Sequence, residues 1–306
     1  MGGDVVSQGP EDWTPRQYDV HHRTTYTYEG PVESCFERGF LAPRETPSQR
    51  VLSNEVVISP DPQVMTEHVD HFGNHSFYVE IQTAHNELIV EKRSRFEVHW
   101  PQPDLAALDR WTVASAAAEL LESAEAVERV GHLLPSPLVQ PAPEVVDYCR
   151  SVIGPDMPLG EAILALTRGI YRDFAYKSGV TTVRTTLPEL LELRQGVCQD
   201  FAHLAIGCLR SLGLPTRYVS GYLETQPPPG QVKLAGADAS HAWASVMVPG
   251  GGWVDLDPTN DHLADSRYVV TAWGRDFRDV SPLKGVVFAE AAGASTLNVA
   301  VDVTRV

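Results

Sequence analysis

Positive charge is scarce in this 306-residue sequence, because 24 lysine and arginine residues stand against 40 aspartate and glutamate residues for a formal net charge of −16. A field of this sign repels phosphate backbones and anionic lipids, so we expect neither nucleic acid nor a membrane as a partner. No apolar run approaches the roughly 20 residues of a bilayer-spanning helix, and residues 1–19 lack the basic start and apolar stretch of an export signal. The sequence therefore predicts a cytoplasmic protein.

Cysteine is scarce as well. The four cysteines, Cys35, Cys149, Cys198 and Cys208, form no CxxC pair, and they are too few for a disulfide framework in a chain of this length. We expect reduced thiols. Because free cysteine usually behaves as a small hydrophobic residue, Cys35, Cys149 and Cys208 are predicted to be buried and inert. Cys198 has a different sequence context and is considered separately.

The order of the local patterns predicts an α+β protein. Hydrophobic residues make up 43% of the chain, enough for real cores, and the length suggests two domains. Residues 1–17 are polar and aperiodic and are predicted to be a flexible tail. Alternating aromatic and β-branched residues predict an antiparallel β domain over residues 18–104. Residues 105–143 are predicted to form a helical connection, and residues 144–306 an α+β domain that includes the C-terminal strands.

The segment GVCQDFAHLAIGCLRSLG, residues 196–213, contains the best candidate for a reactive group. Its apolar positions follow the spacing of a half-buried helix and are Ala202, Ala205, Ile206, Leu209 and Leu212. This spacing places Cys198 in the first turn. There the positive end of the helix dipole favours a thiolate, and free backbone N–H groups can receive an oxyanion. Cys198 is therefore the candidate nucleophile.

A thiol nucleophile needs a base and a group that orients the base, and a predicted hairpin offers both. One strand carries His241 and Trp243 on one face, and the other carries Asp255 and Asp257 on one face. If the turn has three or five residues centred on Gly250, Asp257 faces Trp243 and lies diagonal to His241. A four-residue turn would put His241 and Asp257 on opposite faces. The sequence alone leaves both registers open.

These residues carry a resemblance to a known family. The chain resembles bacterial members of the transglutaminase-like superfamily, the papain-related cysteine enzymes, over nearly its whole length. In the second half the matching blocks are Thr185-Thr186, Leu190-Leu191, residues 196–203, Leu212-Gly213, residues 239–243 and residues 252–259. In the first half they are His22, Tyr26, Tyr28, Pro43-Arg44, Asp70 and residues 72–74, and residues 274–277 and 279–282 resemble the closing segment of the family.

The resemblance implies a fold and a chemistry. The fold would be an N-terminal antiparallel β domain followed by a papain/transglutaminase-like core, in which the helix carrying the cysteine packs on an antiparallel sheet. Cys198 would attack as the thiolate, His241 would act as general base and then acid, and Asp257 would orient His241. Asp255 would be either a partner of another side chain or a surface residue. The implied reaction is acyl transfer or amide hydrolysis through a thioester, on a peptide or protein amide or a small acyl donor, with water or an amine as acceptor.

Four further residues are candidates for supporting roles. Asp200 and His203 lie three positions apart on the predicted helix, where Asp200 could cap the first turn and His203 could brace the helix against the sheet. Trp243 and Tyr222 could form a wall of the acyl site, although aromatic residues on strands are usually part of a core. The proline-rich residues 225–236 form either a gate of the cleft or a linker without a function.

Two other functions have less support in the sequence. His68, His71 and His75 cluster, but the turn over residues 70–74 accounts for polar residues there and nothing completes a tetrahedral site, so neither a metal nor another cofactor is expected.

A non-catalytic peptide-binding or assembly protein with the same fold is the alternative to an enzyme. It would gain nothing from keeping a thiol, a base and an orienting acid together. The oligomeric state and the role of the β domain stay open.

Overall fold

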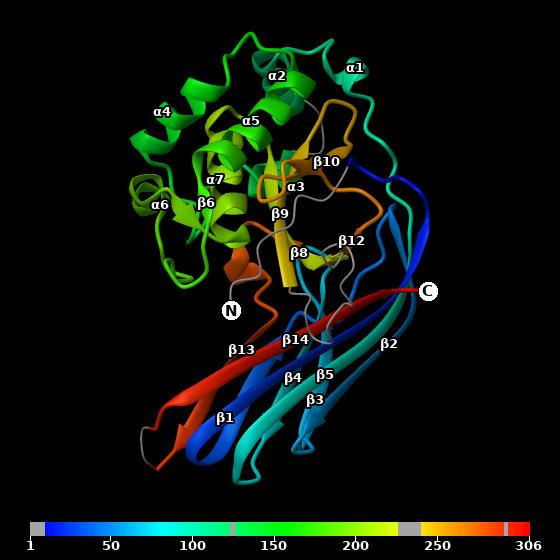
Figure 1. The fold of residues 1–306 in the computed structure, drawn as a ribbon, viewed down its shortest axis with the longest axis vertical. Helices are drawn as coiled ribbons and strands as arrows, with labels where there is room; N and C mark the ends of the chain where they lie inside the picture. The colour runs from blue at the N-terminus through cyan, green and yellow to red at the C-terminus, as the bar shows by residue number, and fades with distance from the viewer. Residues whose placement is uncertain (1–9, 123–125, 226–239, 291–292) are drawn as a thin grey trace, which may run out of the picture.

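The computed structural model describes residues 10–122, 126–225, 240–290 and 293–306. An elongated antiparallel sheet lies at the bottom of Figure 1, and a unit of helices and strands lies above it. We call the lower part the N-terminal sheet. Its strands are β1 (Arg16–Gly39), β2 (Gln49–Ser59), β3 (Val64–Val69), β4 (His75–Ile81), β5 (His85–Val98), β13 (Leu283–Ala289) and β14 (Ser295–Arg305).

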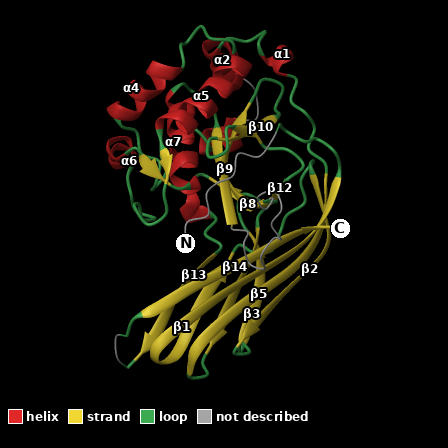
Figure 2. Ribbon diagram, in the orientation of Figure 1, coloured by secondary structure: helices red, strands yellow, loops and turns green. Residues whose placement is uncertain are grey.

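The upper unit combines a helical layer with a second sheet, so the predicted α+β class is confirmed (Figure 2). Its helices are α1 (Leu105–Leu108), α2 (Val113–Glu122), α3 (Ala126–Gly131), α4 (Pro143–Val152), α5 (Leu159–Asp173), α6 (Leu187–Leu193), α7 (Cys198–Ser211) and the short 3₁₀ helix η1 (Phe277–Asp279). Its strands are β6 (Ala175–Tyr176), β7 (Gln195–Gly196), β8 (Thr216–Leu223), β9 (Ser240–Met247), β10 (Trp253–Asp257), β11 (His262–Leu263) and β12 (Tyr268–Gly274).

The C-terminal strands differ from the expected domain division. Residues 144–306 were predicted to form one domain, but β13 and β14 pair with β1 in the N-terminal sheet. The 24-residue β1 is long enough for both, because residues 18–28 pair with β14 and residues 32–39 pair with β13. The predicted tail is also too long, since β1 begins at Arg16, which is buried. Alternation identifies a strand, but it does not identify the partner of that strand.

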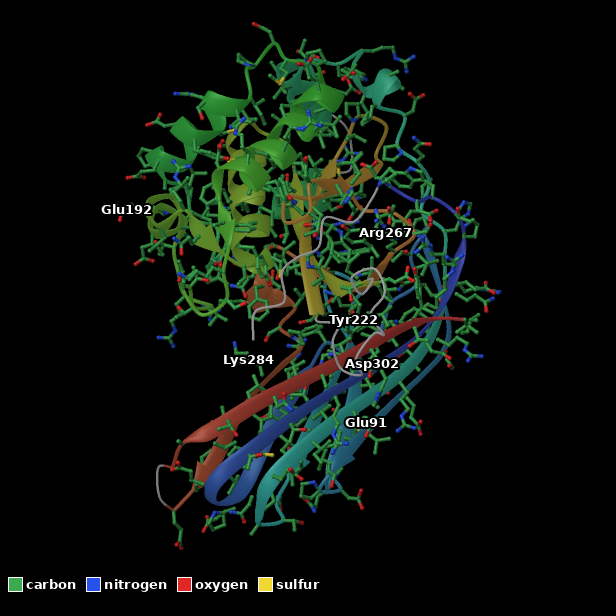
Figure 3. The ribbon with its side chains drawn as sticks, in the orientation of Figure 1. Glu91, Glu192, Tyr222, Arg267, Lys284 and Asp302 are labelled. Carbon is green, nitrogen blue, oxygen red and sulfur yellow. The ribbon has the colours of Figure 1, made fainter. Side chains whose placement is uncertain are left out.

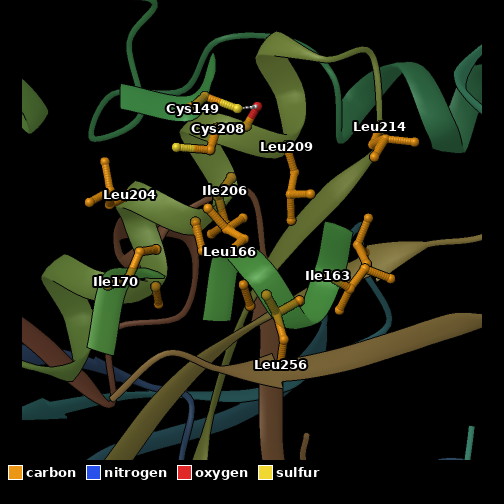
Figure 4. Packing of buried hydrophobic residues seen from close by; sticks show 14 of the residues in the cluster. Cys149, Ile163, Leu166, Ile170, Leu204, Ile206, Cys208, Leu209, Leu214 and Leu256 are labelled. Carbon is orange, nitrogen blue, oxygen red and sulfur yellow. Dashed lines mark hydrogen bonds between the residues drawn. The ribbon is translucent and has the colours of Figure 1, made fainter. Parts of the chain in front are cut away.

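The second sheet, which we call the core sheet, has the strand order β11-β10-β9-β8-β12 and is antiparallel throughout. Helices α4, α5 and α7 contribute to the apolar cluster on one of its faces. Figure 4 shows part of that packing, where Cys149 and Cys208 lie side by side and the Cys149 thiol donates to the backbone oxygen of Cys208 at 3.5 Å. Cys35, Cys149 and Cys208 are each 0% exposed, which confirms their predicted burial.

The other face of the core sheet packs on the N-terminal sheet. A second apolar cluster joins the two sheets, and its largest members are Trp243, Tyr222 and Tyr268 from the core sheet and Tyr18 and Phe96 from the N-terminal sheet. Each of these rings is at most 2% exposed. The core sheet is therefore covered on both faces, by helices on one side and by strands on the other. Within the described ranges, no helix has both the length and the apolar character needed to cross a bilayer.

Gly221 on β8 provides a test of this packing. A Cβ at this position would lie 2.0 Å from the backbone oxygen of Val269 and 2.7 Å from the indole of Trp243. We expect Gly221→Ala to lower the free energy of unfolding by about 2 kcal/mol or more, because neither neighbour can move without disturbing the sheet. Urea denaturation of the variant measures this. The matched control is Gly30→Ala on β1, where the added Cβ meets nothing within 4 Å, and a similar loss in both variants would contradict the packing argument.

Candidate active site

Helix α7 begins at Cys198, as its apolar spacing predicts. Val197 precedes the helix with an extended backbone, and the Asp200 carboxylate accepts a hydrogen bond from the Val197 N–H at 2.9 Å. A carboxylate in the first turn satisfies a backbone donor and complements the positive end of the helix dipole. The 14-residue helix therefore presents Cys198 at its N-terminus, where the residue is partly exposed.

Asp200 is buried beside the nucleophile candidate. The same oxygen that accepts from Val197 also accepts from the Thr181 hydroxyl at 2.7 Å. Burial raises the pKa of Asp200, and these two hydrogen bonds oppose the effect. The residue thus ties the backbone before Cys198 to the loop that contains Thr181. This is the capping role that the sequence suggested.

The hairpin of β9 and β10 adopts the register that unites His241 with Asp257. Val248 and Gly252 close a three-residue turn centred on Gly250, and Asp255 pairs with Ser245 in the ladder. His241 and Asp257 therefore share a face, and His241 Nε2 lies 2.7 Å from Asp257 Oδ2. The first of the two registers left open by the sequence is the correct one.

The Asp257 carboxylate is 0% exposed and is surrounded by donors. Besides His241, Oδ2 accepts from the Asn260 amide at 2.6 Å and from the Tyr268 hydroxyl at 2.8 Å. Oδ1 accepts from the Thr259 N–H at 2.9 Å. Burial would raise the pKa of Asp257, but the charge of His241 and these hydrogen bonds outweigh it and hold the pKa below its usual value. The group is therefore an anion at neutral pH.

The imidazole of His241 is held as a cation. Burial would lower its pKa, but the negative charge of Asp257, the hydrogen bond to it and the interaction with Cys198 raise the pKa of His241 to about 10. Since Nε2 faces the carboxylate, Nδ1 is the ring nitrogen available to a second partner; this assignment follows from the hydrogen-bond pattern. The interaction between Cys198 and His241 links the start of α7 to the hairpin.

Two donors to Asp257 were missed in the sequence. Asn260 follows the Asp-Pro-Thr run directly, and an amide at the end of the turn after β10 is the signal that could have identified it. Tyr268 lies eleven residues from Asp257 and starts a different strand, β12. No local pattern connects Tyr268 to the site, because the contact depends on how the sheet is assembled.

The other supporting candidates lie behind the site. His203 Nε2 accepts from the Phe277 N–H at 3.1 Å, and its ring lies 5.0 Å from that of Tyr218 on β8, so it braces α7 against η1 and the sheet. Burial lowers the pKa of His203 to about 4, which leaves it neutral. It thus has the bracing role that we suggested.

Trp243 and Tyr222 do not form an open wall. Trp243 is 0% exposed, and its indole N–H donates to Asp255 at 2.9 Å, so Asp255 is a buried partner and not a surface residue. The Tyr222 hydroxyl lies 2.8 Å from Nδ1 of His22. Figure 3 labels Tyr222 at the level where the two sheets meet. Both aromatic residues belong to the core between the sheets, and the proposed gate at residues 225–236 lies almost wholly outside the described residues.

The clustered histidines His68 and His71 contact residues close to them in the chain. His68 Nε2 lies 3.0 Å from the Thr66 hydroxyl, and the ring of His71 lies 5.0 Å from that of Phe72. In the part of the chain that the structure describes, no three potential metal ligands of the His, Cys, Asp or Glu type come together.

The fold and the site, a partly exposed thiol at a helix start and a histidine bonded to a buried carboxylate, are those of a family of cysteine enzymes. Residues 18–97 match the bacterial transglutaminase-like N-terminal region, and residues 146–258 match the transglutaminase-like superfamily. The chain belongs to this superfamily.

Known proteins resemble the chain to different extents, two of them in sequence and one in structure. A protein of Mycobacterium tuberculosis is 42% identical over 315 residues, which cover 99% of this chain and 97% of that protein. A protein-glutamine gamma-glutamyltransferase of Pseudomonas aeruginosa is 35% identical over 71 residues, which cover 23% of this chain and 11% of that protein. The structure of a "putative cysteine protease" from Cytophaga hutchinsonii superimposes with a TM-score of 0.77 at 22% identity, over 95% of this chain and 91% of that one. This last likeness confirms the fold.

The raised pKa of His241 predicts how stability depends on pH. Because the folded pKa is about 10 and the unfolded value about 6.5, the imidazolium contributes its full stabilisation below pH ~6.5 and loses it as the pH rises towards 10. We expect His241→Gln to lower the free energy of unfolding by about 2 kcal/mol near pH 6, and the difference from the parent protein to shrink towards pH 10. Urea denaturation across this range measures it. A difference that does not vary with pH would contradict the predicted shift.

Proposed function

We propose that the protein catalyses cysteine-dependent acyl transfer with Cys198 as nucleophile, His241 as proton carrier and Asp257 as the group that orients His241. The observation that carries this proposal is the 2.7 Å hydrogen bond between His241 Nε2 and the buried Asp257 carboxylate. It fixes the imidazole so that its other nitrogen serves the thiol at the start of α7. A proton carrier with a fixed orientation beside a nucleophile is the arrangement that covalent catalysis requires.

The reaction follows from these roles in two stages. In the first, the Cys198 thiolate attacks the carbonyl carbon of an amide or ester and forms a tetrahedral oxyanion. The bond to the leaving group then breaks, the proton on His241 passes to the leaving amine or alcohol, and a thioester remains on Cys198. In the second, His241 accepts a proton from water or an amine as it attacks the thioester. The acyl product leaves, and the thiolate and imidazolium are restored.

The first turn of α7 supports stabilisation of the oxyanion. Backbone N–H groups at a helix start have no partner within the helix, and they point outward together with the positive end of the dipole. A carbonyl oxygen bound at the thiol would gain negative charge next to these donors. Such fixed donors stabilise the transition state more than the substrate, because charge develops only as the reaction proceeds.

The acyl donor in this proposal is a peptide or protein amide, or a small acyl compound, and the acceptor is water or an amine. Over 71 residues the chain is similar to a protein named protein-glutamine gamma-glutamyltransferase, and this similarity supports an amine acceptor. The partly exposed thiol is accessible to either acceptor. The two acceptors distinguish a hydrolase from a transferase, and they can be compared in one experiment.

Selective alkylation tests the nucleophile. We expect one thiol per chain, Cys198, to react with iodoacetamide at pH 7 about a hundredfold faster than Cys149 or Cys208, because it is partly exposed and paired with an imidazolium. Peptide mass spectrometry locates the label and times its appearance.

Two variants serve as controls for this alkylation. Cys198→Ala should abolish the fast phase, and Cys208→Ala, which removes a fully buried thiol, should keep it. If Cys198 in the parent protein reacts no faster than the cysteine of an unstructured peptide at the same pH, the proposed function is wrong.

A comparison of water and a primary amine as acceptors tests whether the protein is a hydrolase or a transferase. A protein with reactive glutamine side chains, such as casein, is incubated with the enzyme and a fluorescent primary amine. A transferase attaches the amine to the protein, whereas a hydrolase releases ammonia or cleaves the chain without attaching the amine. We expect amine incorporation that rises with amine concentration and falls at least about a hundredfold in Cys198→Ala, as loss of a covalent nucleophile predicts. Release of hydrolysis products alone, unaffected by amine, would assign the protein as a hydrolase.

A further inference from the structure

Strand β12 is the edge strand of the core sheet, and side chains of the N-terminal sheet complete its open edge. The Gln49 amide donates to the Val270 backbone oxygen at 2.8 Å and accepts from the Val270 N–H at 2.8 Å. The Asn74 amide donates to the Trp273 oxygen at 2.7 Å and accepts from the Trp273 N–H at 3.0 Å. Each side-chain amide thus makes the pair of hydrogen bonds that a neighbouring strand would make.

These two amides are themselves held by residues in the loops that join strands of the N-terminal sheet. Asn74 donates to the Asp70 carboxylate at 2.9 Å and accepts from the Arg44 guanidinium at 2.6 Å. Gln49 donates to the Arg44 backbone oxygen at 2.9 Å, and the Arg44 guanidinium lies 3.3 Å above the Trp273 ring. Gln49 is 4% exposed and Asn74 is 0% exposed. The edge of β12 is therefore held by a rigid, desolvated network and not by mobile surface groups.

The start of β12 reaches the catalytic carboxylate. Tyr268 is the first residue of the strand, and the Trp100 indole N–H fixes its backbone by donating to the Tyr268 oxygen at 2.9 Å. The Tyr268 side chain is 1% exposed, and its hydroxyl donates to Asp257 Oδ2 at 2.8 Å. Its ring meets the Trp243 ring edge-on with centroids 5.3 Å apart. The hydroxyl therefore has a defined position set by the backbone of β12 and by ring packing.

We propose that Tyr268 is a positioning residue for catalysis, through which the N-terminal sheet sets the geometry of the active site. The sheet fixes β12, β12 fixes the Tyr268 hydroxyl, and the hydroxyl fixes the Asp257 oxygen that holds His241. The inference rests on the proposed roles of Cys198, His241 and Asp257. It gives the N-terminal sheet a part in the reaction although the sheet contributes no reacting group.

The torsion of the Asp257 side chain explains why a donor from another strand matters. The terminal χ2 torsion of aspartate is broad, so the orientation of the carboxylate depends on all of its donors. Asn260 and the Thr259 N–H donate from the turn directly after Asp257, whereas Tyr268 donates from a separate strand. The Tyr268 hydroxyl approaches the oxygen that holds His241, and rotation would break both bonds at once. Without the Tyr268 hydroxyl, the imidazole of His241 would spend less time in the orientation that serves Cys198.

Tyr268→Phe tests the proposal because it removes the hydroxyl and keeps the ring. We expect the second-order rate constant for iodoacetamide alkylation of Cys198 at pH 7 to fall about tenfold, the size of effect that loss of one hydrogen bond to a charged group produces. We also expect the pH profile of that rate to move to higher pH, because a less oriented imidazolium stabilises the thiolate less. A merely structural role would lower the melting temperature and leave the pH profile in place.

Tyr148→Phe is the matched control for this substitution. Tyr148 is a 7% exposed tyrosine on α4 whose hydroxyl donates to Asp173 at 3.3 Å, far along the chain from the hairpin. It should keep the alkylation rate and profile of the parent protein. If Tyr268→Phe keeps them as well, within about twofold, the positioning role is wrong. The proposed function would then still stand, because it fails only if the parent Cys198 shows no enhanced reactivity.

A double-mutant cycle tests the connection to the N-terminal sheet. We expect Gln49→Ala, which removes the side-chain amide from the edge of β12, to lower the alkylation rate about threefold. In the Tyr268→Phe background the same substitution should change the rate less than about twofold, because the hydroxyl through which it acts is gone. Equal effects of Gln49→Ala in both backgrounds would show that the N-terminal sheet does not act through Tyr268. Circular dichroism confirms that each variant is folded.

Discussion

A buried negative charge is the constraint on which the site depends. Removing a carboxylate from water is expensive unless hydrogen-bond donors and positive charge replace the water. Asp257 is 0% exposed, and its two oxygens accept from His241, Asn260, Tyr268 and the Thr259 backbone. These donors come from β9, the turn after β10, and β12. The buried charge of Asp257 is stabilised only when β9, the turn after β10, and β12 are all in place. The same assembly that stabilises the fold therefore also orients His241.

The turn between β9 and β10 sets the register that brings His241 and Asp257 together. Gly250 and Gly251 have φ angles of 96° and 82°, which residues with a side chain rarely adopt, and they allow the three-residue turn between Val248 and Gly252. A turn one residue longer would shift the pairing and move Asp257 to the face opposite His241. The buried carboxylate would then lose its charged partner. Two glycines at the far end of the hairpin therefore determine whether the imidazole and the carboxylate meet.

Local patterns in the sequence predicted the parts of the site that lie on one element. The apolar spacing of α7 located Cys198 at its start, and alternation on β9 and β10 placed His241 and Asp257 on the same face for one of two registers. Long-range contacts were not predictable in this way. The pairing of β13 and β14 with β1 crosses most of the chain, and the Tyr268 contact requires the full order of the core sheet. Alternation also could not show that Trp243 and Tyr222 face another sheet instead of a cleft.

The N-terminal sheet explains why those aromatic residues are buried. An α+β unit with helices on one face of its sheet would leave the other face in water, yet here that face carries Trp243 and Tyr268. Covering it lowers the local dielectric constant around Asp257, and this strengthens the attraction between the carboxylate and the imidazolium. The helical layer thus supplies the thiol, whereas the N-terminal sheet supplies the dry environment in which the two charges hold each other. The orientation of His241 therefore depends on both units of the fold, because water that entered between the two sheets would weaken the interaction between His241 and Asp257.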